Sequence, residues 1–194
     1  MPLNLFTPDD TAILLIDHQI GTMSWVRSTE HAEMLANAVA LAKAAKALDL
    51  PLVLTTSLED HDQGPLAPEI AVVAPDEYAA RIQRIGVVNA MDDPAFAAAV
   101  AAAGRRNLVI AGVTNDVCTV YPTLTALDQG YQVQVVADAG GSMSTQADEV
   151  ALRRMENAGA GITSTNMILT ELAKSWASPA GQALIPVVGE LIPS

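Results

Sequence analysis

The sequence predicts an α/β fold, a three-layer α-β-α sandwich with a mainly parallel sheet of about six strands. Short apolar runs alternate along the chain with alanine-rich segments of helical length. The apolar runs are continuous rather than interrupted by polar residues, which is typical of parallel strands buried on both faces. A chain of 194 residues is long enough for one domain with a sizeable core. We therefore expect a single domain over residues 1–194.

Each predicted element has a local signal. The predicted strands are Thr11–Ile16, Leu52–Thr56, Ala79–Arg84 (the weakest), Leu108–Ala111, Gln132–Ala137 and Ile162–Ser164. The predicted helices are His31–Leu48, 94–104, Asp116–Gln129, Thr145–Asn157 and Met167–Trp176. The second helix has a favourable start, because the Asp93 carboxylate can cap it and Pro94 fits its first position. Pro65 and Pro68 bracket a stretch that we expect to be irregular.

Composition and charge exclude several classes of partner. The formal net charge of −12 argues against nucleic acid, because phosphate binding needs clustered Lys and Arg. We expect no membrane span, because no apolar stretch is long enough to cross a bilayer, and the N-terminal residues lack the basic and apolar regions of a signal peptide. A single cysteine cannot form an intrachain disulfide. These features predict a cytoplasmic protein.

The segment after Ser178 has no obvious place in a three-layer core. Its apolar residues are Leu184, Ile185, Val187, Val188, Leu191 and Ile192. We expect residues 178–194 to form a tail at an interface between subunits of a homo-oligomer, since large apolar patches are usually covered. The alternative is that the tail folds back on its own domain.

The only cysteine, Cys118, lies between a predicted strand and the helix that follows it. A strand followed by a tight turn would deliver its thiol to the first turn of the helix, at the carboxyl edge of the sheet. Free backbone N–H groups and the helix dipole there favour an anion, so we expect the thiol pKa to fall. The same N–H groups could receive the oxyanion of a carbonyl under attack. The alternative is that Cys118 is a small buried apolar side chain.

Two other titratable residues follow predicted strands, Asp17 and Arg84. In an open parallel sheet, functional groups gather beyond the carboxyl ends of the strands. Asp17 could serve as a base if burial raises its pKa, and Arg84 could stabilise a thiolate. Considered singly, Asp17 could equally be a cap and Arg84 a salt-bridge residue. A Cys/His pair has little support. His18 would point to the opposite face from Asp17, His31 is at a helix start, and His61 is in a polar loop.

Several short motifs in this order resemble the isochorismatase-like cysteine hydrolases, most closely the YcaC-like subgroup. The resemblance extends from about Asp9 to Trp176. The motifs that carry it are Asp17-His18-Gln19, Thr55-Thr56-Ser57, Arg84 with Gly86 and Asn89-Ala90, Gly112-Val113-Thr114-Asn115-Asp116-Val117-Cys118, Ala137-Asp138-Ala139 and Asn157-Ala158-Gly159-Ala160. The resemblance implies the isochorismatase-like hydrolase fold and a closed homo-oligomer, a tetramer or an octamer.

The resemblance also implies a catalytic site. The family's triad of aspartate, cation and cysteine falls on Asp17, Arg84 and Cys118. A cis peptide bond falls between Val113 and Thr114, and it would turn the Thr114 N–H toward the Cys118 N–H to form an oxyanion hole. The implied activity is cysteine-dependent cleavage of a C–N bond in a small amide-type molecule, through a thioester.

Two departures from the family pattern shape this expectation. Arg84 stands where most amidases of the family carry lysine, and arginine cannot relay a proton because it stays protonated. Asp17 would then carry all of the acid–base chemistry. The zinc-binding nicotinamidases of the superfamily have an ordered Asp/His set that the segment from Thr55 to Asp62 lacks, so we expect no metal and no cofactor.

Two other functions stay open on sequence grounds. An isochorismatase-type vinyl-ether hydrolase would need no thiolate, so its activity would survive Cys118→Ala. A non-catalytic oligomeric binding or scaffold protein would have a Cys118 thiol that reacts only after unfolding. The expected pocket walls come from the loops at residues 21–28 and 59–68.

Overall fold

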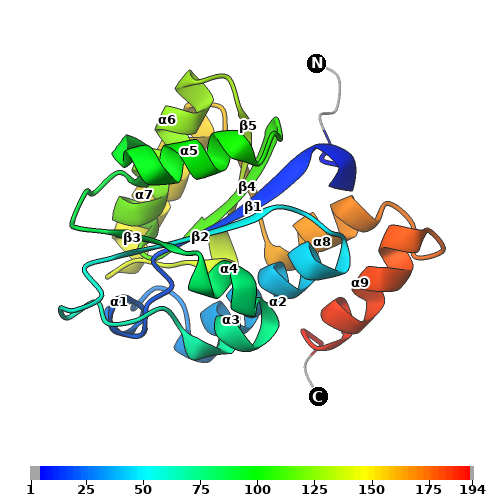
Figure 1. Ribbon diagram of the computed structural model, residues 1–194, viewed down its shortest axis with the longest axis horizontal. Coiled ribbons are helices and arrows are strands. Elements are labelled where there is room, and N and C mark those ends of the chain that lie inside the picture. The colour runs from blue at the N-terminus through cyan, green and yellow to red at the C-terminus, as the bar shows by residue number, and fades with distance from the viewer. Residues whose placement is uncertain (1–4, 193–194) are drawn as a thin grey trace.

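The computed structural model describes residues 5–192, which form a six-stranded sheet in the order β3-β2-β1-β4-β5-β6 (Figure 1). Every neighbouring pair of strands is parallel. The strands are β1 (Thr11–Ile16), β2 (Leu52–Ser57), β3 (Ile82–Arg84), β4 (Asn107–Gly112), β5 (Gln132–Val136) and β6 (Gly161–Thr163). The structure confirms the predicted fold class.

Helices cover both faces of the sheet. They are α1 (Ile20–Ser24), α2 (His31–Ala47), α3 (Pro68–Val73), α4 (Pro75–Ala79), α5 (Pro94–Ala102), α6 (Val120–Asp128), α7 (Thr145–Asn157), α8 (Thr165–Ala173) and α9 (Pro179–Gly189). Helices α5, α6 and α7 lie on one face, and α2, α8 and α9 lie on the other (Figure 1). Every residue of β1 and β4 is buried, as their continuous apolar sequences predict.

The order of the strands creates the site for chemistry. From β1 the chain builds outward through β2 to β3, and it then returns to the other side of β1 with β4. Such a reversal opens a crevice at the carboxyl ends of the two central strands. The register aligns those ends, because Ile16 pairs with Gly112 on one side and with Thr55 on the other, while Ser57 pairs with Arg84.

The largest difference from the predicted elements lies before β3. Only Ile82–Arg84 is a strand, whereas Pro75–Ala79 forms α4 and Pro68–Val73 forms α3. Both helices begin with proline at their first position and carry acidic residues in their first turn, which stabilise a helix start. The prediction of a strand beginning at Ala79 was therefore wrong in its first half.

The C-terminal segment is a helix rather than an extended tail. Helix α9 packs against α8 and α2, and it buries Leu184 and Val187 in the chain's own core. These two residues therefore need no other subunit to cover them. Ile185 and Ile192 stay exposed, the latter at 68%. Ser194, the last residue of the predicted tail, lies outside the described residues. The place of this segment at an oligomer interface stays a prediction.

Within residues 5–192, we find no helix that combines the length and the hydropathy needed to cross a membrane.

Candidate active site

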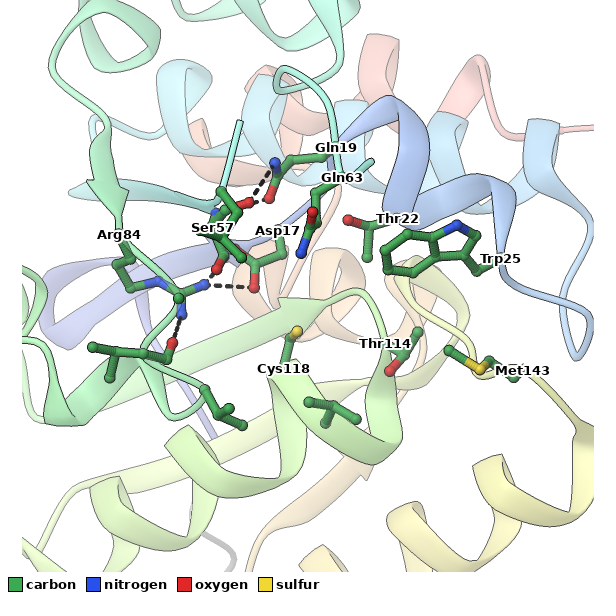
Figure 2. A pocket seen from close by; sticks show the side chains of 15 residues that line it. Asp17, Gln19, Thr22, Trp25, Ser57, Gln63, Arg84, Thr114, Cys118 and Met143 are labelled. Atoms are coloured by element: carbon green, nitrogen blue, oxygen red, sulfur yellow. Dashed lines mark hydrogen bonds and ion pairs between the residues drawn. The ribbon is translucent and has the colours of Figure 1, made fainter. Parts of the chain in front are cut away.

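Asp17, Arg84 and Cys118 meet around one cavity at the carboxyl edge of the sheet (Figure 2). Asp17 directly follows β1, Arg84 is the last residue of β3, and Cys118 lies in a single π-helical turn, Asn115–Thr119, after β4. The cavity has a volume of about 270 Å³. The three residues that the sequence singled out lie at or after the ends of three separate strands, and they line the same small cavity.

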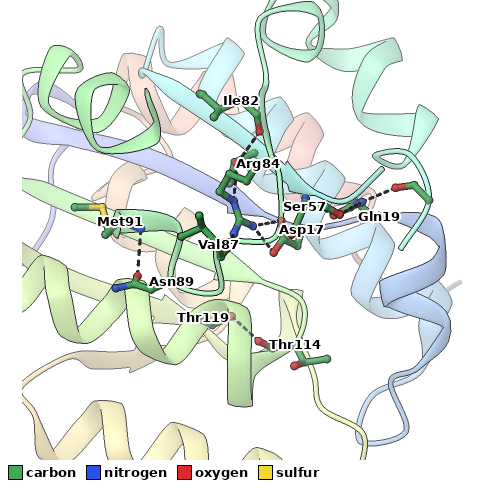
Figure 3. A network of polar contacts seen from close by, with 12 residues as sticks. Asp17, Gln19, Ser57, Ile82, Arg84, Val87, Asn89, Met91, Thr114 and Thr119 are labelled. Atoms are coloured by element: carbon green, nitrogen blue, oxygen red, sulfur yellow. Dashed lines mark hydrogen bonds and ion pairs between the residues drawn. The ribbon is translucent and has the colours of Figure 1, made fainter. Parts of the chain in front are cut away.

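The Asp17 carboxylate and the Arg84 guanidinium form a buried ion pair (Figure 3). Their side chains are only 2% and 1% exposed. Arg84 Nη2 donates to both carboxylate oxygens, Nη1 donates to the Val87 carbonyl, and Nε donates to Thr55 Oγ1 at 3.1 Å. Because the guanidinium is fixed at three nitrogens, it acts as a stationary positive charge beside the carboxylate.

The backbone around Asp17 places its carboxylate at this edge. Asp17 has a left-handed conformation with φ of 59°, which aspartate tolerates better than most residues. Its N–H donates to the Thr55 carbonyl at 3.0 Å, and its own carbonyl accepts the Gln19 N–H at 2.7 Å. The chain therefore turns sharply as soon as it leaves β1.

The Cys118 thiol and the Asp17 carboxylate line the same cavity and interact electrostatically (Figure 2). Burial raises the pKa of Cys118 well above its ordinary value, and the negative charge of Asp17 raises it further. Arg84 and the Thr114 N–H oppose this increase in the thiol pKa, but they do not outweigh it. The expectation of a lowered thiol pKa was wrong, because burial and the neighbouring Asp17 carboxylate outweigh the effect of the helix start.

Burial also raises the pKa of Asp17, while Arg84 acts in the opposite direction. The carboxylate is thus a stronger base than an exposed aspartate, and it lines the same cavity as the thiol. A proton can pass from Cys118 to Asp17 without any movement of the backbone. The pair is suited to generate a thiolate when a substrate is bound rather than to store one.

The turn between β4 and Cys118 contains a cis peptide bond between Val113 and Thr114, where the family resemblance places it. The Thr114 N–H is directed at the Cys118 sulfur. The Thr114 carbonyl accepts three N–H groups, from Val117 at 3.3 Å, Cys118 at 2.8 Å and Thr119 at 3.1 Å. The Cys118 N–H is therefore already paired, and the expected oxyanion hole with two free donors is not formed in this structure.

His18 takes no part in the site. Its ring is completely buried, and its Nε2 lies 2.8 Å from the Ala139 carbonyl. That contact requires the proton on Nε2, and Nδ1 has no partner among the residues described. Burial lowers the pKa of His18 to about 4, so the ring is neutral near pH 7.

Further residues complete the cavity wall. The polar ones are Gln19, Thr22, Ser57, Gln63 and Thr114, and the larger apolar ones are Trp25, Leu58, Val87, Val88, Val117 and Met143. Several of them come from the two loops that the sequence indicated as pocket walls. Met143 was not predicted, and no local signal marks it, because it reaches the cavity only through tertiary folding.

The loop that carries Gln63 is held against the start of α1. The Gln19 amide donates to the carbonyls of Ser57, at 2.9 Å, and Gly64, and its oxygen accepts the Ser57 N–H at 2.8 Å. The Gly21 N–H donates to the Gln63 carbonyl at 2.8 Å. This approach is so close that a Cβ on Gly21 would lie 1.8 Å from the Asp62 carbonyl oxygen. The loop therefore has a fixed position over the cavity.

Among residues 5–192, no three or more His, Cys, Asp or Glu side chains gather closely enough to hold a metal ion.

Comparison with known proteins places the chain in a family. The isochorismatase domain matches residues 11–167. The chain belongs to the isochorismatase family. Within the family it is 40% identical to the probable hydrolase YcaC of Escherichia coli over 168 residues, which cover 87% of this chain and 80% of that protein. It is therefore similar to a hydrolase of the YcaC-like subgroup, as the sequence motifs predicted.

Solved structures of YcaC proteins have the same isochorismatase-family fold. The Pseudomonas aeruginosa YcaC structure with hexane-2,5-diol and covalent acrylamide is 38% identical, with a TM-score of 0.89, over 98% of this chain and 96% of that one. The E. coli YcaC structure has the same identity, TM-score and coverage, and it is described as an octameric hydrolase of unknown specificity. Together the comparisons identify the chain as an isochorismatase-family hydrolase.

Proposed function

We propose that this hydrolase cleaves the C–N bond of a small amide-type molecule, with Cys118 as nucleophile. One observation carries the proposal: the Cys118 thiol shares a small cavity with a buried carboxylate that is itself paired with a fixed guanidinium. A nucleophile, its base and an orienting charge are thereby brought together.

The first half of the reaction forms a thioester. Asp17 accepts the thiol proton, and the Cys118 sulfur attacks the amide carbon to give a tetrahedral oxyanion. Asp17 then returns the proton to the leaving nitrogen, the C–N bond breaks, and ammonia or an amine departs. Arg84 stays charged throughout and stabilises the carboxylate in its basic form.

The second half regenerates the enzyme. Asp17 accepts a proton from a water molecule, whose oxygen attacks the thioester carbon. The C–S bond then breaks, and the proton returns to the Cys118 sulfur as the carboxylic acid product leaves. The sum of both halves is an amide and water converted into an acid and ammonia or an amine.

The oxyanion of both halves needs a hydrogen-bond donor. The Thr114 N–H is the available backbone group, since it already faces the sulfur. A donor of this kind contributes roughly 3–4 kcal/mol in comparable sites. A second donor, the Cys118 N–H, would have to release the Thr114 carbonyl that it now contacts at 2.8 Å.

A relative supports the choice of nucleophile. The P. aeruginosa YcaC structure contains covalent acrylamide. Acrylamide has a carboxamide and an electrophilic carbon that reacts with thiolates. Cys118 is the only cysteine of the present chain, and it lines the cavity.

The proposal is tested by measuring ammonia release from a panel of small amides and ureides. With any substrate found, Cys118→Ser should abolish turnover and leave the circular dichroism spectrum unchanged, because serine is nearly isosteric. Rapid acid quench and intact-mass analysis should show the acyl group on the parent enzyme alone. Activity that survives Cys118→Ala would instead support a vinyl-ether hydrolase, and a thiol inert in the folded protein would support a binding or scaffold role.

The same proposal covers assembly and location. The octameric E. coli relative and the exposed Ile185 and Ile192 support a homo-oligomer, a tetramer or an octamer, with the C-terminal segment at an interface. The single unpaired cysteine is compatible with the cytoplasm.

A further inference from the structure

The charged groups in the cavity neutralise each other. Among the described residues that line it, Arg84 is the only cation and Asp17 the only anion. The three guanidinium nitrogens of Arg84 already donate to Asp17, Val87 and Thr55, and the Asp17 carboxylate balances the positive charge. Arg27 lies outside beside Trp25 and Met143, and its guanidinium donates to the carbonyls of Ser24 and Val26. A negatively charged ligand would therefore enter the cavity without a counter-ion.

Gln63 is a polar group that is available to a ligand. Its backbone is fixed by the Gly21 and Thr22 N–H groups, which donate to its carbonyl at 2.8 and 3.3 Å. Its side chain projects into the cavity between Asp17 and Thr22 (Figure 2). Within residues 5–192, no residue forms a hydrogen bond with the Gln63 amide. An amide offers one acceptor and two donors, the complement of another carboxamide.

Thr22 is a second polar group in the same wall. It is only 4% exposed, and its Oγ1 has no hydrogen-bond partner among the residues described. A buried hydroxyl without a partner is costly in a purely structural role. The rest of the wall is largely apolar and includes Val117, with Trp25 and Met143 on the side that Figure 2 shows next to Thr114.

We propose that Gln63 is a specificity-determining residue that, with Thr22, selects small uncharged carboxamides with an apolar body and discriminates against carboxylates. The proposal rests on the function proposed above and adds the substrate class to it. Gln63 would donate to or accept from the substrate amide, while the apolar wall would hold the rest of the molecule.

Alkylation of Cys118 tests recognition without requiring turnover. Iodoacetamide carries a carboxamide, iodoacetate carries a carboxylate, and methyl methanethiosulfonate is neutral without an amide. In the two alkylations the sulfur forms an S–C bond, iodide leaves, and the thiol proton passes to Asp17 or to solvent. The rates at one pH are divided by those of N-acetylcysteine, which removes intrinsic reactivity.

The parent protein should favour iodoacetamide over both other reagents after this correction. Gln63→Leu should lower the ratio of iodoacetamide to methanethiosulfonate rates by about three- to tenfold, the effect of losing one hydrogen bond. Gln63→Lys should raise the iodoacetate rate relative to that of iodoacetamide, because it adds a cation. Thr22→Val should lower the first ratio without lowering the urea midpoint, whereas a structural hydroxyl would lower the midpoint.

Gln129→Leu is the matched control, because Gln129 is an exposed glutamine at the far end of α6. It should leave every ratio unchanged. Ratios in Gln63→Leu that equal those of the parent, or a parent with no preference for iodoacetamide, would overturn the role of Gln63. A Cys118 that reacts with none of the reagents until the protein unfolds would overturn the proposed function as well, so the two failures are distinguishable.

Discussion

Gly21→Ala tests whether the loop that carries Gln63 is fixed as described. Gly21 has no left-handed backbone, so alanine is allowed there and only packing opposes it. The added Cβ would lie 1.8 Å from the Asp62 carbonyl oxygen and 2.7 Å from that of Gln63, whereas real Cβ contacts are essentially never below 3.0 Å. The first carbonyl must therefore retreat by at least 1.2 Å, from 1.8 to 3.0 Å.

This retreat has a cost that can be worked out from the contacts. Overpacking costs about 1–3 kcal/mol, and weakening the two N–H bonds to the Gln63 carbonyl costs about 1 kcal/mol each. We expect Gly21→Ala to lower the free energy of unfolding by about 3–5 kcal/mol. Displacement of Gln63 should also lower the ratio of iodoacetamide to methanethiosulfonate rates.

Urea denaturation and the alkylation assay measure the two effects. Gly189→Ala is the matched control, because a Cβ on Gly189, at the end of α9, meets nothing within 4 Å. Alanine there should stabilise the protein by about 0.4–1 kcal/mol. If Gly21→Ala is as stable as Gly189→Ala, the loop is not held in this position and the reasoning fails.

Three further predictions concern charge and assembly. Because burial lowers the pKa of His18 from 6.5 to about 4, the neutral ring's contribution to stability should be full above pH 6.5 and fall by about 3 kcal/mol toward pH 4. His18→Gln should flatten this pH dependence of the urea midpoint and His31→Gln should not, so equal slopes in the two variants would refute the prediction. Arg84→Met leaves the buried Asp17 carboxylate unpaired and should destabilise the protein by about 3–5 kcal/mol near pH 7, and by less near pH 5, where the carboxyl can take up a proton; an equal loss at both values would contradict the ion pair. Replacing Ile185 and Ile192 with lysine should reduce the particle mass in light scattering, and an unchanged mass would remove that exposed face from the interface.

The sequence predicted the central sheet well, because burial on both faces leaves a continuous apolar run that is visible locally. It failed where the signal is short or depends on distant contacts. β3 has three residues and follows a helix whose last residue, Ala79, fits either element. Helix α9 contains Pro186 in its interior, a residue that disfavours helices, yet packing on α2 and α8 stabilises α9.

The residues of the site could be predicted from local signals, but their electrostatics and exact positions could not. Asp17, Arg84 and Cys118 could be identified because each follows a strand or ends one, and parallel strands end at one edge. The direction in which the thiol pKa shifts could not be predicted, because segments far apart in the sequence bury Cys118. Gln63 could be assigned to a pocket loop. The position of its backbone could not be predicted, because it depends on the contact between the Gly21 N–H and the Gln63 carbonyl.

The central claim is that Asp17 is the base for the Cys118 thiol. The most direct test is the pH dependence of iodoacetamide alkylation in the parent and in Asp17→Asn, followed by intact mass. Asn removes the negative charge that raises the thiol pKa and leaves Arg84 in place, so the pKa of Cys118 should fall below that of the parent, while turnover is lost. A thiol pKa that is unchanged or higher in Asp17→Asn would contradict the account.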